Sequence, residues 1–167
     1  MTAESDRTPL RFKVISGGQT GVDRAGLDAA QEAGIAIGGW CPKDRRAMDG
    51  VIPSSYPLTE TESRGYAVRT EWNVRDSDAT LILCIGNLSG GTRLTADFAR
   101  QYGKPLLIVD LQQLHDHKAV VAWLCRHAVQ VLNIAGPREE DCPGCYASAK
   151  RFLSFLFSGQ GRVCSSA

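Results

Sequence analysis

Glycine gathers in two short windows whose composition is typical of loops that approach a ligand closely. The 167-residue chain contains 17 glycines. Seven of them lie in the two windows or, for Gly26, just after the first: Gly17, Gly18, Gly21, Gly26, Gly86, Gly90 and Gly91. Glycine lacks a Cβ, so it allows sharp turns and close contact between backbone and ligand. Two such windows in one small chain predict a binding site for a small molecule.

The first window, Ser16–Arg24, joins a strand-like segment to a helical one. Thr20 and Asp23 have the spacing of a capping box. A helix N-terminus offers unpaired N–H groups and a partial positive charge, which favour phosphate. The alternative is a tight turn without a ligand. The residues expected to contact a ligand here are Gly17, Gly18, Gln19, Thr20, Gly21, Asp23 and Arg24.

The second window, Gly86–Asp97, has the same order of strand, loop and helix. The bare amides of Gly90 and Gly91 would face an anion, with hydroxyl groups around them from Ser89, Thr92 and Thr95. The alternative is an ordinary helix start, capped by Ser89 or Thr92. Taken together, the two loops favour a phosphate-bearing ligand.

Two common phosphate-binding motifs do not fit these windows. Thr92 and Arg93 stand where a P-loop has its Lys and Ser/Thr, so nucleotide hydrolysis of that type is not expected. The first window reads Gly-Gly-x-x-Gly rather than Gly-x-Gly-x-x-Gly. The next strand ends at Gly38 and Gly39, without an acid to hold a ribose. A standard dinucleotide-dependent dehydrogenase is therefore disfavoured.

The elements that must position these loops alternate between strands and helices. Strand-like segments are expected at 11–16, 35–37, 79–85, 106–110 and 130–134. Helical spacing is found at 22–33, 63–75, 89–102, 116–128 and 144–157. This alternation predicts a single Rossmann-like three-layer α/β domain over 11–158, with a mainly parallel sheet of about five strands. Both glycine loops then lie at the carboxyl ends of strands, where ligands bind.

The remaining segments are interpreted as loops and tails. Residues 39–62 contain three prolines and no clean period, so a long, functional loop is expected there. Residues 1–10 and 159–167 are interpreted as flexible tails.

Charge and hydropathy narrow the function further. Nineteen basic and 18 acidic residues give a net charge of +1, which predicts no general field for nucleic acid. No apolar run is long enough for a membrane helix, and the polar N-terminus lacks a signal core, so a cytoplasmic protein is expected.

Six cysteines are present, and free thiols are expected in a reducing compartment. Cys142 and Cys145 form a CxxC motif, but no second pair completes a zinc site, so no metal centre is predicted. The motif is interpreted as a turn before the last helix, with metal or redox use as the alternative.

Five segments occur in an order that resembles the putative molybdenum carrier family. They are GGQTGVD at 17–23, GWCPKDRRAMDG at 39–50, RTEWNVRDSD at 69–78, SGGT at 89–92 and NIAGPR at 133–138. The resemblance covers about residues 12–157. It places the chain in a Rossmann-like (SLOG) group that also resembles the lysine-decarboxylase-like and lonely-guy phosphoribohydrolase proteins.

The resemblance implies a parallel α/β sheet, a homo-oligomer (dimer or tetramer) and a small phosphorylated ligand. Carrier members bind and protect molybdenum cofactor, a pterin with a terminal phosphate and a dithiolene-held molybdenum. The chain is thus expected to carry this cofactor as cargo without chemical turnover. Candidate partners are molybdoenzymes and cofactor-biosynthesis proteins; nucleic acid and membrane are not expected.

On this hypothesis, the amides of 18–21 and 90–92 would hold phosphate or molybdate oxo groups. Arg24 or Lys43 would add charge-assisted hydrogen bonds. The loop 39–62, with Trp40, would cover the ligand.

Carboxylates have two possible roles. Asp23 or Asp97 would accept hydrogen bonds from pterin N–H groups. The alternative function is a nucleotide-binding protein, or a phosphoribohydrolase that cleaves a nucleoside monophosphate. Asp97 stands where the hydrolases have their acid/base glutamate and is the only catalytic candidate. The ligand of either alternative would be a phosphate-bearing nucleotide.

Overall fold

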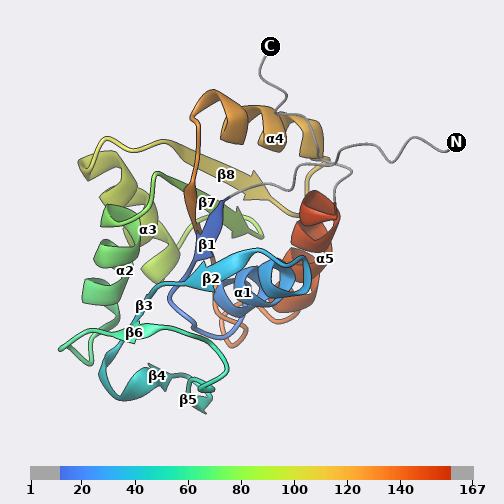
Figure 1. Ribbon diagram of the computed structural model, residues 1–167. Coiled ribbons are helices and arrows are strands. Elements are labelled where there is room, and N and C mark those ends of the chain that lie inside the picture. Colours follow the sequence, from blue (N-terminus) through green and yellow to red (C-terminus); the bar gives the residue numbers. More distant parts are fainter. Residues whose placement is uncertain (1–11, 159–167) are drawn as a thin grey trace, which may run out of the picture.

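A sheet of five parallel strands lies at the centre of the computed structural model, which describes residues 12–158 (Figure 1). The predicted tails, 1–10 and 159–167, lie outside the described residues. All strand pairs in this sheet are parallel. In spatial order the strands are β2 (Ala36–Gly38), β1 (Lys13–Ile15), β9 (Val131–Ala135), β7 (Ala79–Cys84) and β8 (Leu106–Asp110). The prediction of a Rossmann-like α/β fold is confirmed.

Helices cover both faces of the sheet, so the domain has three layers with the sheet in the middle (Figure 1). One face carries α1 (Val22–Glu32), α4 (His117–Arg126) and α5 (Cys145–Phe157), whose buried side chains share the largest apolar cluster. The other face carries α2 (Tyr66–Arg75) and α3 (Gly90–Gln101). Right-handed crossovers produce this division, because the chain moves one way from β1 to β2 and the other way from β7 to β8.

The core sits against the central strands. All six side chains of β7, the segment ATLILC, are buried. A strand with helices on both faces has no solvent side, so its sequence shows no polar alternation. Leu81 and Leu83 join the cluster under α1, α4 and α5, whereas Ile82 packs with Ala96 of α3. This packing fixes the carboxyl end of β7, where the second glycine loop begins.

The segment 39–62, which was predicted to be a long loop, contains several short elements, and Arg45 holds them together. Its short elements are β3 (Trp40–Cys41), the 3-10 turn η1 (Lys43–Arg45), β4 (Arg46–Ala47), β5 (Gly50–Val51) and β6 (Thr59–Glu60). The Arg45 guanidinium donates to four backbone carbonyls of the same segment, those of Ile52, Pro53, Tyr56 and Leu58. A permanently charged, five-donor group can hold several chain turns together.

The side-chain caps predicted for α1 and α3 from local sequence patterns are not formed in the structure. The capping box predicted for α1 is absent, because the N-cap residue is Gly21 and no side chain caps the helix. The α3 helix likewise begins without a side-chain cap from Ser89. The α4 helix does have a side-chain cap: Asp116 is the N-cap and accepts a 2.8 Å hydrogen bond from the Lys118 amide. In the part of the chain that the structure describes, no helix has the length and apolar character needed to span a membrane.

Candidate functional site

A cavity of about 270 Å³ lies over the carboxyl ends of three neighbouring strands, β1, β9 and β7. The loops that leave these strands line it, together with the first turns of α2 and α3. The chain leaves β1 and β7 in opposite directions, and such a switch point opens a crevice between adjacent loops. Seven of the residues predicted from the glycine windows meet here: Gln19, Asp23, Ser89, Gly90, Gly91, Thr92 and Thr95.

The second glycine loop presents an open helix N-terminus to this cavity. No residue within 12–158 accepts a hydrogen bond from the amides of Gly90 or Gly91. A Cβ built on either glycine meets no atom within 4 Å, so the space in front of this backbone is empty. The partial positive charge of a 12-residue helix adds to these two donors. This arrangement can bind an anion by main-chain hydrogen bonds.

The first glycine loop, by contrast, uses its amides internally. The Gln19 amide donates to Asp23 Oδ2 at 3.3 Å, and the Thr20 amide donates to Gln19 Oε1 at 3.0 Å. The Val22 amide donates to the Pro137 carbonyl at 3.1 Å. Two of the four amides over 18–21, those of Gln19 and Thr20, are therefore not free to bind a ligand. The Thr20 hydroxyl is not free to donate to a ligand, because it donates to Glu140.

Close packing explains the glycines of this loop. A Cβ on Gly17 would lie 1.8 Å from Nη1 of Arg69, so the missing side chain makes room for a guanidinium. Gly21 has a φ of +83°, and its Cβ would lie 2.4 Å from the Pro137 carbonyl oxygen. Gly18 is pressed against Leu58 in the same way. These glycines shape the wall of the cavity rather than contact what it holds.

A buried ion pair forms the floor of the cavity. Arg69 Nη1 of α2 lies 3.1 Å from Asp23 Oδ2 of α1, and the Asp23 side chain is only 4% exposed. Burial raises the pKa of Asp23, although Arg69 and the Gln19 amide act in the opposite direction. Arg69 Nε is enclosed and has no hydrogen-bond partner. Arg69 is the first residue of the RTEWNVRDSD motif, but its pairing with Asp23 was not predicted, because the two residues lie 46 positions apart.

The loop after β9 supplies the rim. Arg138 and Asp141 both line the cavity, and Arg138 Nε donates to Asp141 Oδ2 at 2.5 Å. Glu139 holds this loop in place by accepting hydrogen bonds from the first amides of α5, those of Gly144 and Tyr146. These two bonds lower the pKa of Glu139. The rim residues lie far along the chain from both glycine windows, and the NIAGPR motif was the signal that contained Arg138.

Three predicted charged residues lie away from the cavity lining. Arg24 forms a two-pronged ion pair with Asp49, with Nη2 2.8 Å from Oδ1, and its Nε donates to the Gly18 carbonyl. Lys43 is exposed on η1. Asp97 is also exposed and pairs with Arg100 one turn later on α3. The structure therefore does not bring these side chains together with Gly90 and Gly91.

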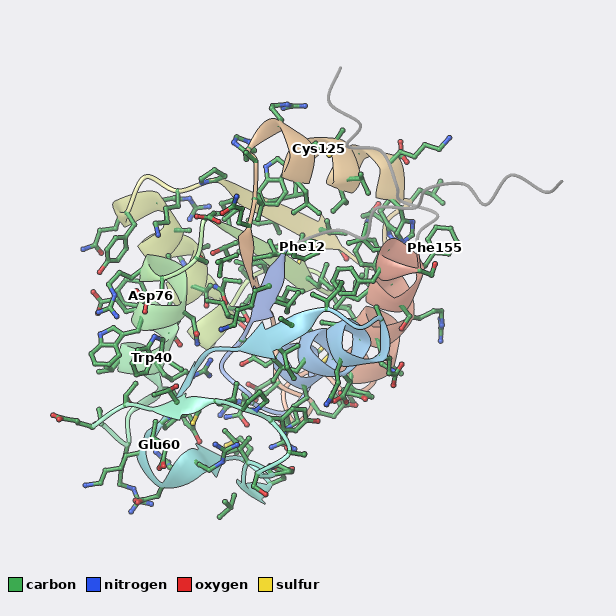
Figure 2. The ribbon with its side chains drawn as sticks, in the orientation of Figure 1. Phe12, Trp40, Glu60, Asp76, Cys125 and Phe155 are labelled. Carbon is green, nitrogen blue, oxygen red and sulfur yellow. The ribbon has the colours of Figure 1, made fainter. Side chains whose placement is uncertain are left out.

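Likewise, the segment 39–62 contributes no residue to the cavity lining. Trp40 packs edge-on against Trp72 of α2 at 4.8 Å between ring centroids, and its Nε1 donates to Asp76. Figure 2 shows Trp40 and Asp76 together beside α2. The segment instead contacts the first loop from outside, where the Met48 amide donates to Gln19 Oε1 at 2.9 Å. The predicted cover is thus a buttress behind the first loop.

The cysteine pair opens a helix, as predicted. Cys142 lies in the turn and the buried Cys145 begins α5; burial and the neighbouring Glu139 raise the pKa of the Cys145 thiol to about 12. Residues 12–158 contain no group of three or more metal-binding side chains. The described free thiols are Cys41, Cys84, Cys142 and Cys145. Cys125 is disulfide-bonded, so the prediction of free thiols is wrong for that residue.

Comparison with known proteins agrees with this architecture. The model of the "Circularly permutated YpsA SLOG family" matches residues 14–157. A crystal structure of a protein named "Putative molybdenum carrier protein", from Syntrophus aciditrophicus SB, is 46% identical, with a TM-score of 0.83. The similarity covers 91% of this chain and 98% of that chain. None of the curated proteins matches.

The family match covers the sheet, its helices and the three loops that line the cavity. It agrees with the resemblance found in the five sequence motifs, and the solved structure extends the agreement to three dimensions. The chain belongs to the circularly permutated YpsA SLOG family.

Proposed function

We propose that this protein binds molybdenum cofactor, protects it and delivers it without chemical turnover. The observation that carries the proposal is the cavity at the carboxyl edge of the sheet, where free main-chain donors and arginine side chains meet. The likeness to a protein named as a molybdenum carrier supports the choice of cargo. Molybdoenzymes and cofactor-biosynthesis proteins are the partners that would receive or supply it, and a homo-oligomer is expected.

The second glycine loop would hold the anionic end of the cofactor. The amides of Gly90 and Gly91 have no other acceptor among residues 12–158, and the hydroxyls of Ser89 and Thr92 stand beside them. Arg138 on the opposite rim would add a charged donor, and charge-assisted hydrogen bonds are roughly twice as strong as neutral ones. Phosphate and molybdenum oxo groups both accept such bonds.

The carboxylates of the cavity favour carriage without turnover. Asp23 is paired with Arg69, and Asp141 is paired with Arg138. A general acid or base needs a carboxyl group that is free to exchange a proton with the substrate. Asp97, the candidate for hydrolysis, pairs with Arg100 outside the cavity lining. These pairings favour a carrier over a phosphoribohydrolase.

The experiment is anaerobic loading with molybdenum cofactor, followed by gel filtration. Bound molybdenum and pterin are quantified, the lifetime of the cofactor in air is compared with and without protein, and transfer to a cofactor-free molybdoenzyme is assayed. Arg138→Ala should reduce retention about tenfold or more, since it removes a charged hydrogen bond. Arg93→Ala, an exposed arginine of α3 outside the cavity lining, is the matched control.

Two results would overturn the proposal. One is a protein that neither retains the cofactor nor slows its oxidation. The other is release of free base from a nucleoside monophosphate, with loss of that activity in Asp97→Asn, which would establish the hydrolase.

A further inference from the structure

We infer that the floor of the cavity, formed by Gln19, Asp23 and Arg69, recognises the lactam edge of a heterocycle, in which a carbonyl oxygen lies beside a ring N–H. The inference rests on the proposed function, because it concerns the part of the ligand that enters deeper than the anionic end. It adds the chemical class of ring that the site accepts.

The orientation of the Gln19 carboxamide is fixed by two backbone donors. Its Oε1 accepts from the Thr20 amide at 3.0 Å and from the Met48 amide at 2.9 Å. Only the oxygen of a carboxamide can accept two N–H groups, so the assignment of oxygen and nitrogen is determined. The side chain lines the cavity and is 7% exposed overall. Its NH₂ group therefore serves as a donor toward the cavity.

Asp23 supplies an acceptor next to this donor. Its Oδ2 is occupied by the Gln19 amide and by Arg69, whereas no residue within 12–158 donates to Oδ1. Among the described residues, the enclosed side-chain atoms without a partner are Arg69 Nε and His117 Nε2. Asp23 Oδ1 is not one of them, so it is open to the cavity that Asp23 lines. Burial raises the pKa of Asp23, whereas Arg69 and the Gln19 amide, which both donate to Oδ2, favour the ionised form in which Oδ1 accepts.

Arg69 is the third member of the floor and a second donor. It lines the cavity, and its Nη2 donates to no residue within 12–158. Because Nη2 is not one of the enclosed atoms without a partner, it is open to the cavity. Gly17 leaves the space in which this guanidinium lies, so the donor is held in place by the fold.

Two donors around one acceptor match a lactam. The carbonyl oxygen has two lone pairs, which can accept from Gln19 and from Arg69, and the adjacent ring N–H can donate to Asp23 Oδ1. The 4-oxo edge of a pterin and the 6-oxo edge of a hypoxanthine or guanine have this pattern. An amino-substituted ring has it reversed, because its NH₂ would meet donors and its bare ring nitrogen would face a carboxylate. A site built this way rejects the wrong edge strongly.

The test measures binding of two ligand pairs at neutral pH by calorimetry. The pairs are 6-hydroxymethylpterin with its 4-amino analogue, and inosine monophosphate with adenosine monophosphate. We expect the oxo member to bind about 100-fold more tightly in at least one pair, in line with rejection of an unpaired polar edge.

Gln19→Glu is the diagnostic variant. One carboxylate oxygen can still accept from the Thr20 and Met48 amides, while the other replaces the NH₂ donor by an acceptor. The preference for the oxo member should fall at least tenfold, and Gln101→Glu, at an exposed position on α3, should leave it unchanged. Circular dichroism and thermal unfolding establish that both variants are folded.

Three results would overturn the inference: equal binding of the two members in both pairs, no binding of any of the four compounds, or an unchanged preference in folded Gln19→Glu. Its failure is distinct from failure of the proposed function. If the protein retains the cofactor but shows no preference for the oxo compound, only the inference about the lactam edge fails. If it prefers the oxo compound but does not retain the cofactor, that inference stands and molybdenum cofactor is not the cargo.

Discussion

Replacing Gly91 by valine separates the binding role of the second loop from its structural role. Gly91 lies in the first turn of α3, its φ is outside the left-handed region, and a Cβ there meets no atom within 4 Å. Valine is a better helix former than glycine by a few tenths of a kcal/mol. The variant should therefore fold and unfold like the parent protein. Its side chain, however, will occupy the space in front of the amides.

The expected loss of affinity follows from the hydrogen bonds involved. An anion at this helix N-terminus would accept from the amides of Gly90 and Gly91, and a hydrogen bond to a charged group contributes about 1.5–3 kcal/mol. Loss of one to two such bonds is about 1.5–6 kcal/mol. Since about 1.4 kcal/mol corresponds to tenfold, the dissociation constant should rise between about tenfold and 10⁴-fold.

Titration calorimetry with the cofactor, or with phosphorylated pterin, measures this constant, and thermal unfolding measures stability. Ala147→Val is the matched control, because it adds the same branched group to the exposed first turn of α5, outside the cavity lining. A Gly91→Val protein that is folded and binds as tightly as the parent would refute the assignment of this loop to the ligand.

Three further substitutions test how the cavity is built. Gly17→Ala should destabilise the protein by about 3 kcal/mol in urea unfolding, because its Cβ displaces the guanidinium of Arg69 from a buried ion pair; parental stability would contradict this. Arg45→Lys should cost about 2 kcal/mol, since one ammonium cannot replace the planar group that reaches four carbonyls. Faster amide exchange over 46–60 would accompany that loss, and its absence would argue against it. Glu139→Gln should cost about 1 kcal/mol at pH 7. The pKa of Glu139 is lowered from 4.5 in the folded protein, so its contribution is complete above that value and is lost as the pH falls through the lowered pKa. Unfolding curves at pH 7 and at a series of acidic pH values measure this loss, and a difference between the two proteins that does not shrink with falling pH would disprove the carboxylate's role.

Local patterns in the sequence were sufficient for most of the framework. The unbroken apolar run at 79–85 predicted a strand covered on both faces, and helical spacing placed α1 and α3 to within a residue or two. Parallel order then required both glycine loops to lie at one edge of the sheet, and seven of the predicted residues do meet in one cavity. These inferences succeed because periodicity and parallel connection are properties of neighbouring residues along the chain.

The state of each polar group was decided only by the tertiary structure. The two glycine loops look alike as sequences, yet the amides of Gln19 and Thr20 are engaged within the fold and those of Gly90 and Gly91 are not. The acceptors are local, Asp23 and the Gln19 side chain, but contacts remote in sequence hold them in place: Arg69 of α2 pairs with Asp23, and the Met48 amide donates to Gln19. Hydrogen bonds and ion pairs join residues that the chain does not place side by side. The sequence by itself determined where a ligand-binding edge would be, and only the packing of α2 and the loop after β9 decided which donors remain free to bind.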